Sequence, residues 1–329
     1  MGRKIVFIGS GRFGLPTLRN LAAGSKPGWE IAHIFTRCPR PAGRGRKLQP
    51  TPVAQLAKDL SLPVIQTPNI NAEDCIEQIK QISPDVILVI DFGQKISSQL
   101  CNIAKLGAIN LHGSLLPELR GPAPVNWAII RGYSRTGVSV IFITEQIDAG
   151  AIITSRETII RPDETAEELE NRLAELGVEA VNDALNQLAS GEVQGIPQDE
   201  SRATKAPKLK KTDGWLRFDT DAKTIRNLIH GTWPWPGGQA RFIAENGKST
   251  DVIIARAEAI EQGQPSAQSI IEQCTPGTID KDLTICCKEG KLKIIQIKPS
   301  GKRLMDWQDF VNGYRVKPGT RFESPDIST

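Results

Sequence analysis

The sequence is poor in the residues that hold metals and disulfide frameworks. It contains three histidines and six cysteines in 329 residues. No histidine lies four residues from another, and no two cysteines show the C-x-x-C spacing that is typical of zinc and redox sites. We therefore expect no bound metal and no disulfide framework, which fits a reducing compartment such as the cytoplasm.

Long apolar runs are also missing. No uncharged stretch reaches the roughly 18 residues that a membrane span needs, and Ile5–Ile8 is a short apolar run directly after two basic residues. We therefore expect neither a membrane anchor nor a signal peptide. The composition, 39% hydrophobic and 24% charged, is that of a globular protein, and the length predicts two domains.

Short apolar runs alternate with helical patterns through the first part of the chain. Lys4–Ile8, Glu30–Thr36 and Asp85–Ile90 are strand-like, and stretches of helical periodicity separate them. Thr51 and Pro52 are predicted to be the N-cap and first position of one helix, and Thr165 and Glu168 form a capping box before the last long helix of this part. This alternation predicts an α/β domain with a Rossmann-like, parallel-rich sheet.

The pattern changes after the long helix. Residues 191–207 have no periodicity, and beyond them short β-branched segments such as Asp251–Ala255 and Lys291–Ile297 predict a small, OB-like β-barrel. The expected division is an α/β domain over 1–190, a linker over 191–207 and a barrel domain over 208–329.

The positive charge is unevenly distributed. Residues 1–204 carry 21 basic and 22 acidic side chains, whereas residues 205–329 carry 20 basic and 15 acidic ones. A second basic stretch, 37–47, holds five cations and two glycines. Two separate basic surfaces suggest a polyanionic partner, and an ordinary solvated surface is the alternative.

Gly9–Gly14 reads G-x-G-x-x-G between a strand and a helix, which is the pattern of dinucleotide-binding sites. Such sites also place an acid at the end of the second strand, but Thr36 and Arg37 stand there. Arg37 would suit the 2′-phosphate of NADP, yet no hydride-transfer residues stand out. We therefore favour a structural turn over an NADP-dependent oxidoreductase.

Asn110, His112 and Ser114 alternate at the end of a predicted strand, so their side chains share one face. Open α/β sheets bind ligands at this end of their strands. Asp148 lies in a later connection from which it could reach the same crevice and orient the imidazole. A structural histidine that contacts a backbone carbonyl is the simpler alternative.

Longer motifs resemble the folate-dependent formyltransferases, and the resemblance covers nearly the whole chain. Its centre is NLHGSLLPELRGPAPVNWAI (Asn110–Ile129), which TGVSV and IDAG follow. Further segments resemble the members of the family that act on methionyl-tRNA, namely Pro41–Ala57, Ala206–Gly214, Trp233–Gly237 and Ser300–Gly319.

The resemblance implies formyl transfer from the co-substrate 10-formyltetrahydrofolate to the amino group of methionyl initiator tRNA, without a metal or an obligate protein partner. Asn110 would donate to the oxyanion, His112 would donate a proton to the leaving nitrogen, and Asp148 would favour the charged imidazole and accept the amine proton through a water. Arg120 would fix the Ser114–Pro117 loop or form a structural salt bridge. Folate contacts are implied for Ser114, Leu115, Leu116, Pro117, Phe92 and Gly93, and tRNA contacts for Arg44, Arg46, Lys47, Lys208, Lys210 and Lys211.

Two segments depart from the family pattern. Gly9-Ser10-Gly11 replaces the usual Gly-Thr-Pro, and Asp91-Phe92-Gly93 replaces a frequent Ala-Tyr-Gly. The Asn126-Trp127 pair is also similar to formyltransferases that act on nucleotide sugars, so an amino-sugar nucleotide remains an alternative acceptor. A catalytically silent RNA-binding protein is a further hypothesis, and the presence of Asn110, His112 and Asp148 disfavours it.

Overall fold

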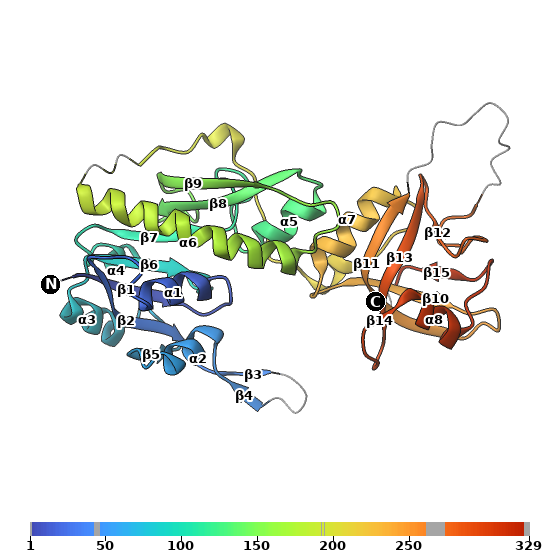
Figure 1. Cartoon of the computed structure of the whole chain (residues 1–329), viewed down its shortest axis with the longest axis horizontal. Helices are drawn as coiled ribbons and strands as arrows, with labels where there is room; N and C mark the ends of the chain where they lie inside the picture. Colours follow the sequence, from blue (N-terminus) through green and yellow to red (C-terminus); the bar gives the residue numbers. More distant parts are fainter. Residues whose placement is uncertain (1, 43–46, 192, 194, 261–273, 326–329) are drawn as a thin grey trace. The chain divides into compact units, whose positions relative to one another are not determined.

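The computed structural model describes residues 2–42, 47–191, 193, 195–260 and 274–325. The chain forms two compact units (Figure 1). The first unit comprises Met1–Pro124, Thr136–Ile159 and Glu170–Pro207, and the second comprises Val125–Arg135, Ile160–Leu169 and Lys208–Thr329.

A seven-stranded sheet forms the centre of the first unit, in the order β5-β2-β1-β6-β7-β8-β9. The strands from β5 to β7 are parallel and β8 is antiparallel to β7, which confirms the predicted parallel-rich α/β fold. All five residues of β6 are buried, as expected for a central strand that is covered on both faces. The strands are β1 (Arg3–Gly9), β2 (Trp29–Arg37), β5 (Val64–Thr67), β6 (Val86–Ile90), β7 (Ala108–His112), β8 (Arg135–Phe142) and β9 (Ile152–Ile159).

Two of the helices begin where the sequence places caps. Thr51 Oγ1 accepts the Ala54 N–H at 3.0 Å before α2, and Thr165 and Glu168 make the expected reciprocal capping box before α6. The helices α1 (Leu15–Ala22), α2 (Pro52–Asp59), α3 (Glu73–Ile82) and α4 (Ser98–Cys101) lie in the first unit, as does α6 (Ala166–Ser190) apart from its first turn.

Two features of the first unit lie outside its main sheet. β3 (Arg40–Ala42) and β4 (Lys47–Gln49) pair as an antiparallel hairpin. Within the segment expected as a linker, Ile196 pairs with Ile152, and the Ala206 N–H donates to the Arg120 carbonyl at 2.7 Å. This segment is therefore bound to the first unit by backbone hydrogen bonds.

The second unit contains an antiparallel sheet in the order β12-β13-β11-β10-β15, with β14 paired to β13. Gly277–Ile279 hydrogen-bonds both to Cys286 of β12 and to Phe322 of β15, so this segment links the two edge strands. The result is the predicted small barrel. The strands of the second unit are β10 (Gly238–Ile243), β11 (Ser249–Ile260), β12 (Ile285–Cys286), β13 (Lys291–Pro299), β14 (Met305–Asp306) and β15 (Arg321–Glu323). Its helices are α7 (Ala222–Thr232), α8 (Trp307–Tyr314) and, apart from its first residue, α5 (Pro124–Ile130).

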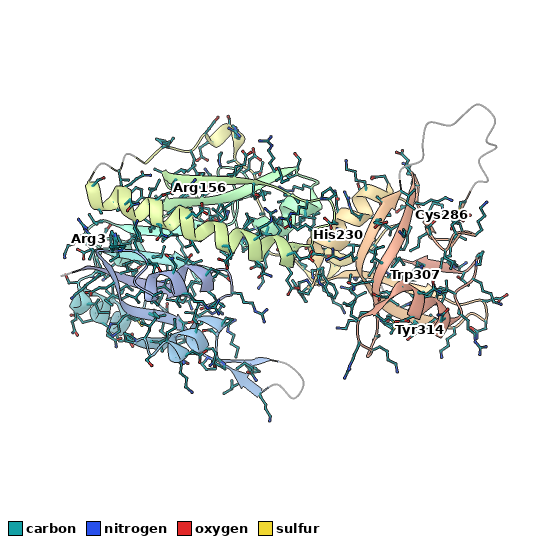
Figure 2. All side chains as sticks on the ribbon, viewed as in Figure 1. Arg3, Arg156, His230, Cys286, Trp307 and Tyr314 are labelled. Atoms are coloured by element: carbon teal, nitrogen blue, oxygen red, sulfur yellow. A yellow bond between two sulfur atoms is a disulfide. The ribbon has the colours of Figure 1, made fainter. Side chains whose placement is uncertain are left out.

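The core of the second unit is aromatic. Phe242 packs edge-on against Phe310 at 5.4 Å between ring centroids, and Phe310 stacks between Trp307 and Tyr314 of α8 (Figure 2). The structure also joins Cys274 to Cys286 with a Cα–Cα separation of 5.9 Å. This single disulfide is not a framework, and the apolar cluster carries the packing of the unit.

Candidate active site

The carboxyl end of β7 carries the first two candidate catalytic residues. Asn110 and His112 alternate with Leu111, which is buried on the opposite face. A side chain at Gly177 of α6 would collide with Leu111 at 2.6 Å, so α6 packs closely on that face. Asn110 and His112 therefore project away from α6, as the alternation predicts, and the Asn110 carboxamide has no hydrogen-bond partner among the described residues.

Both ring nitrogens of His112 face oxygen atoms. Nε2 lies 3.0 Å from the Leu119 carbonyl, and Nδ1 lies 3.7 Å from Oδ2 of Asp148. The ring is only 6% exposed. His112 therefore contacts a backbone carbonyl, as the structural alternative expects, and its other ring nitrogen also lies near the Asp148 carboxylate.

Asp148 is held by the backbone of another loop. Its Oδ2 accepts the Gly121 N–H at 2.8 Å, and its own φ is +54°. Gly121 has a φ of +122°, and a side chain there would approach the Ala206 carbonyl to 2.6 Å, so this position needs glycine. The segments around Gly121, Asp148 and Ala206 therefore lie close together, and this arrangement places the Asp148 carboxylate near His112.

Gln198 fixes the connection that carries Asp148. Its Nε2 donates to the carbonyls of Asp148 and Gly150, both at 2.8 Å. Its Oε1 accepts two hydrogen bonds from Arg120, at 3.0 Å from Nε and 2.7 Å from Nη2. Arg120 also makes a two-point ion pair with Glu200. Arg120 thus forms the salt bridge that the sequence offered as one alternative, and through Gln198 its side chain also supports the connection that carries Asp148.

The loop after β7 is largely buried. Ser114 Oγ donates to the Glu118 carbonyl at 2.6 Å, and Ser139 joins the Ser114 carbonyl to the Leu116 N–H. Ser114, Leu116 and Pro117 are buried, whereas Leu115 is partly exposed. Within this loop the Leu115 side chain is therefore accessible to a ligand, whereas the Ser114 hydroxyl already donates a hydrogen bond within the protein.

The carboxyl end of β6 is next to this loop in the sheet. Phe92 is 3% exposed and belongs to the apolar core, so only its backbone can border a ligand. Gly93 is exposed, and the Arg37 guanidinium lies over it. Asp91 lies against Gly11, so the two departures from the family pattern meet in space.

The structure places only some of the candidate tRNA contacts. Arg44 and Arg46 lie outside the described residues, and Lys47 is exposed at the start of β4. Lys208, Lys210 and Lys211 are exposed, while Leu209 between them is buried.

Sequence reasoning did not identify Gln198, because a lone glutamine in an aperiodic segment gives no local signal. No cluster of three or more His, Cys, Asp or Glu side chains that could hold a metal occurs in the described part of the chain. None of the described helices is long and apolar enough to cross a membrane.

Known proteins resemble both parts of the chain. Residues 3–185 match the family "Formyl transferase", and residues 208–315 match "Formyl transferase, C-terminal domain". A methionyl-tRNA formyltransferase of Geobacter sulfurreducens is 34% identical over 320 residues, which cover 97% of this chain and 96% of that protein. One of Methylococcus capsulatus is 34% identical over 313 residues, which cover 95% and 97% of the two chains.

Solved structures share the fold at low identity. HypX from Aquifex aeolicus in complex with tetrahydrofolic acid has a TM-score of 0.62 and 17% identity, and the match covers 98% of this chain and 51% of that chain. WlaRD, a sugar 3N-formyl transferase, has a TM-score of 0.61 and 13% identity, with 92% and 100% covered. Because both family matches and the full-length relatives agree, this chain belongs to the formyl transferase family and is a homologue of the methionyl-tRNA formyltransferases.

Proposed function

We propose that this chain transfers the formyl group of 10-formyltetrahydrofolate to the free amino group of methionyl initiator tRNA in the cytoplasm. The observation that carries the proposal is the convergence of Asn110, His112 and Asp148 at the carboxyl end of β7, in a chain similar over its full length to methionyl-tRNA formyltransferases.

Attack of an amine on a formyl group places negative charge on the formyl oxygen. Asn110 is neutral, and its carboxamide is free to donate an N–H to that oxygen. The Leu119 carbonyl engages Nε2 of His112, whereas Nδ1 lies too far from Asp148 for a hydrogen bond. Nδ1 carries a proton only in the charged imidazole, and this form would donate that proton to the leaving nitrogen and return to the neutral imidazole, while Asp148 accepts the amine proton through a water.

Substrate binding is divided between the two units. Backbone groups of Phe92 and Gly93, with the Ser114–Pro117 loop and Leu115 in particular, border the folate. Lys47, together with Arg44 and Arg46, contacts the acceptor end of the tRNA. Lys208, Lys210 and Lys211 hold its phosphate backbone from a second domain that begins at residue 208. The similarity to methionyl-tRNA formyltransferases over nearly the full length of the chain supports this over a small acceptor.

A direct assay tests the proposal. The purified chain is mixed with 10-formyltetrahydrofolate and either methionyl initiator tRNA or an amino-sugar nucleotide, and the formylated product is identified by mass spectrometry. We expect N-formylmethionyl-tRNA. Formylation of the amino-sugar nucleotide alone contradicts the proposal and favours the alternative acceptor.

A further inference from the structure

The sheet of the first unit reverses its strand order between β1 and β6. From β1 the chain continues to β2 on one side, and it later returns to β6 on the other side. In open α/β sheets, ligands bind outside the carboxyl ends of the strands at such a reversal. Here β1 ends at Gly9 and β6 ends at Ile90, so Gly11 and Asp91 lie at this point.

The backbone of Asp91 is held firmly. Its carbonyl accepts the N–H groups of Ser10 and Gly11 at 3.0 and 3.1 Å. Its φ is +46°, a left-handed conformation that Asp and Asn adopt more readily than most residues. These hydrogen bonds fix the direction in which the Asp91 side chain leaves the backbone.

Gly11 provides the space for that side chain. A Cβ at position 11 would lie 1.4 Å from Oδ2 of Asp91, and the three nearest atoms all belong to the Asp91 carboxyl group. Gly11 has no left-handed φ, so a side chain is excluded there by space and not by backbone conformation. The pair is therefore built so that the Asp91 carboxyl lies over the Gly11 backbone.

The Asp91 carboxyl has no partner in the described part of the chain. No described residue donates a hydrogen bond to it or forms an ion pair with it, and Arg37 lies over Gly93 instead. Asp91 remains exposed, although the protein around it desolvates the carboxyl and raises its pKa. Because desolvation disfavours the charged carboxyl, a hydrogen-bond donor on a bound ligand would stabilise it.

We propose that Asp91 is a substrate-binding residue whose carboxyl group accepts hydrogen bonds from an N–H-bearing group of a substrate. The proposal rests on the proposed formyl transfer. β6 lies beside β7, with Val89 opposite Asn110, so Asp91 is one strand away from the reacting groups. Two substrate groups of the proposed reaction carry N–H donors: the α-amino group of the aminoacyl ester and the 2-aminopyrimidine edge of the folate.

Kinetics of Asp91→Gly and Asp91→Asn test this role, because both replacements tolerate the left-handed backbone. We expect Asp91→Gly to raise the KM of one substrate about tenfold or more, as for the loss of a charged hydrogen bond, and to leave the other KM within twofold. The affected KM identifies the source of the N–H group. Titration with 5-formyltetrahydrofolate measures folate affinity without turnover.

Gly11→Ala gives a second, independent test. The new methyl group should displace the carboxyl and raise the same KM, with no additional effect when Asp91 is already Gly. If the wild type is active while Asp91→Gly and Gly11→Ala leave both KM values and the folate affinity within twofold, the Asp91 proposal is wrong. A wild type that transfers no formyl group to methionyl-tRNA refutes the proposed function instead.

Discussion

Gln198 offers a sharp test of how the active site is held together. Replacing Gln198 with Ala removes the two hydrogen bonds that its Nε2 makes to the Asp148 and Gly150 carbonyls. Each such bond contributes about 1 kcal/mol net, so the position of Asp148 loses about 2 kcal/mol of stabilisation. Because Asp148 has a left-handed φ, its loop has other conformations available once these bonds are gone.

A loss of about 2 kcal/mol corresponds to a fall of roughly 30-fold in kcat if only the observed loop position is productive. We expect the KM for methionyl-tRNA to remain nearly unchanged, because Gln198 is not among the basic residues proposed to bind tRNA. Steady-state formyl transfer measures both constants, and a thermal unfolding scan reports any general loss of stability.

Glu200→Gln is the matched control. It weakens the ion pair with Arg120, but the Glu200 side chain is 63% exposed and Arg120 keeps both bonds to Gln198. Because solvent screens the exposed Glu200 carboxylate, this ion pair is weak, and kcat should change less than about fivefold. Wild-type kcat in Gln198→Ala, or an equal loss in both variants, would refute the positioning role.

The remaining predictions concern tRNA binding and pH. Arg44→Ala should raise the KM for methionyl-tRNA at physiological salt, and an unchanged KM argues against a tRNA contact there. Replacing Lys208, Lys210 and Lys211 with Gln should lower the slope of log affinity against log salt by about one unit for each phosphate that these lysines neutralise, and an unchanged slope removes them from the interface. His230 has a pKa lowered from 6.5 to about 4, chiefly because burial desolvates its ring. Since the folded pKa is the lower one, its contribution to stability is complete above about pH 6.5 and is lost as the pH falls towards 4, by about 3 kcal/mol. His230→Gln should flatten the stability profile in that window, and identical profiles contradict this.

The sequence was most informative where local chemistry is strong. The alternation of β7 placed Asn110 and His112 on one face, and the caps at Thr51 and Thr165 marked helix starts that the structure confirms. These features depend on neighbours within a few residues. Periodicity and capping therefore predicted the α/β class and much of the element order.

Interactions between distant segments were not predictable in this way. Gln198 acts on a loop 50 residues earlier, and Gly11 matters because Asp91 lies over it. The strand β10 and helix α8 were also missed, although Gln239–Phe242 alternates polar and apolar residues and Trp307, Phe310, Val311 and Tyr314 have helical spacing. Burial against the aromatic core of the second unit, including Phe242 and Phe310, stabilises both.

The most direct measurement of the central claim is the single-turnover rate of formyl transfer from bound 10-formyltetrahydrofolate to methionyl-tRNA in His112→Asn and Asp148→Asn. Both side chains act on charge and protons that move in the transition state, so the rate should fall about a hundredfold or more while tRNA affinity stays near the wild-type value. A variant that keeps more than about a tenth of the wild-type rate contradicts the role assigned to that residue.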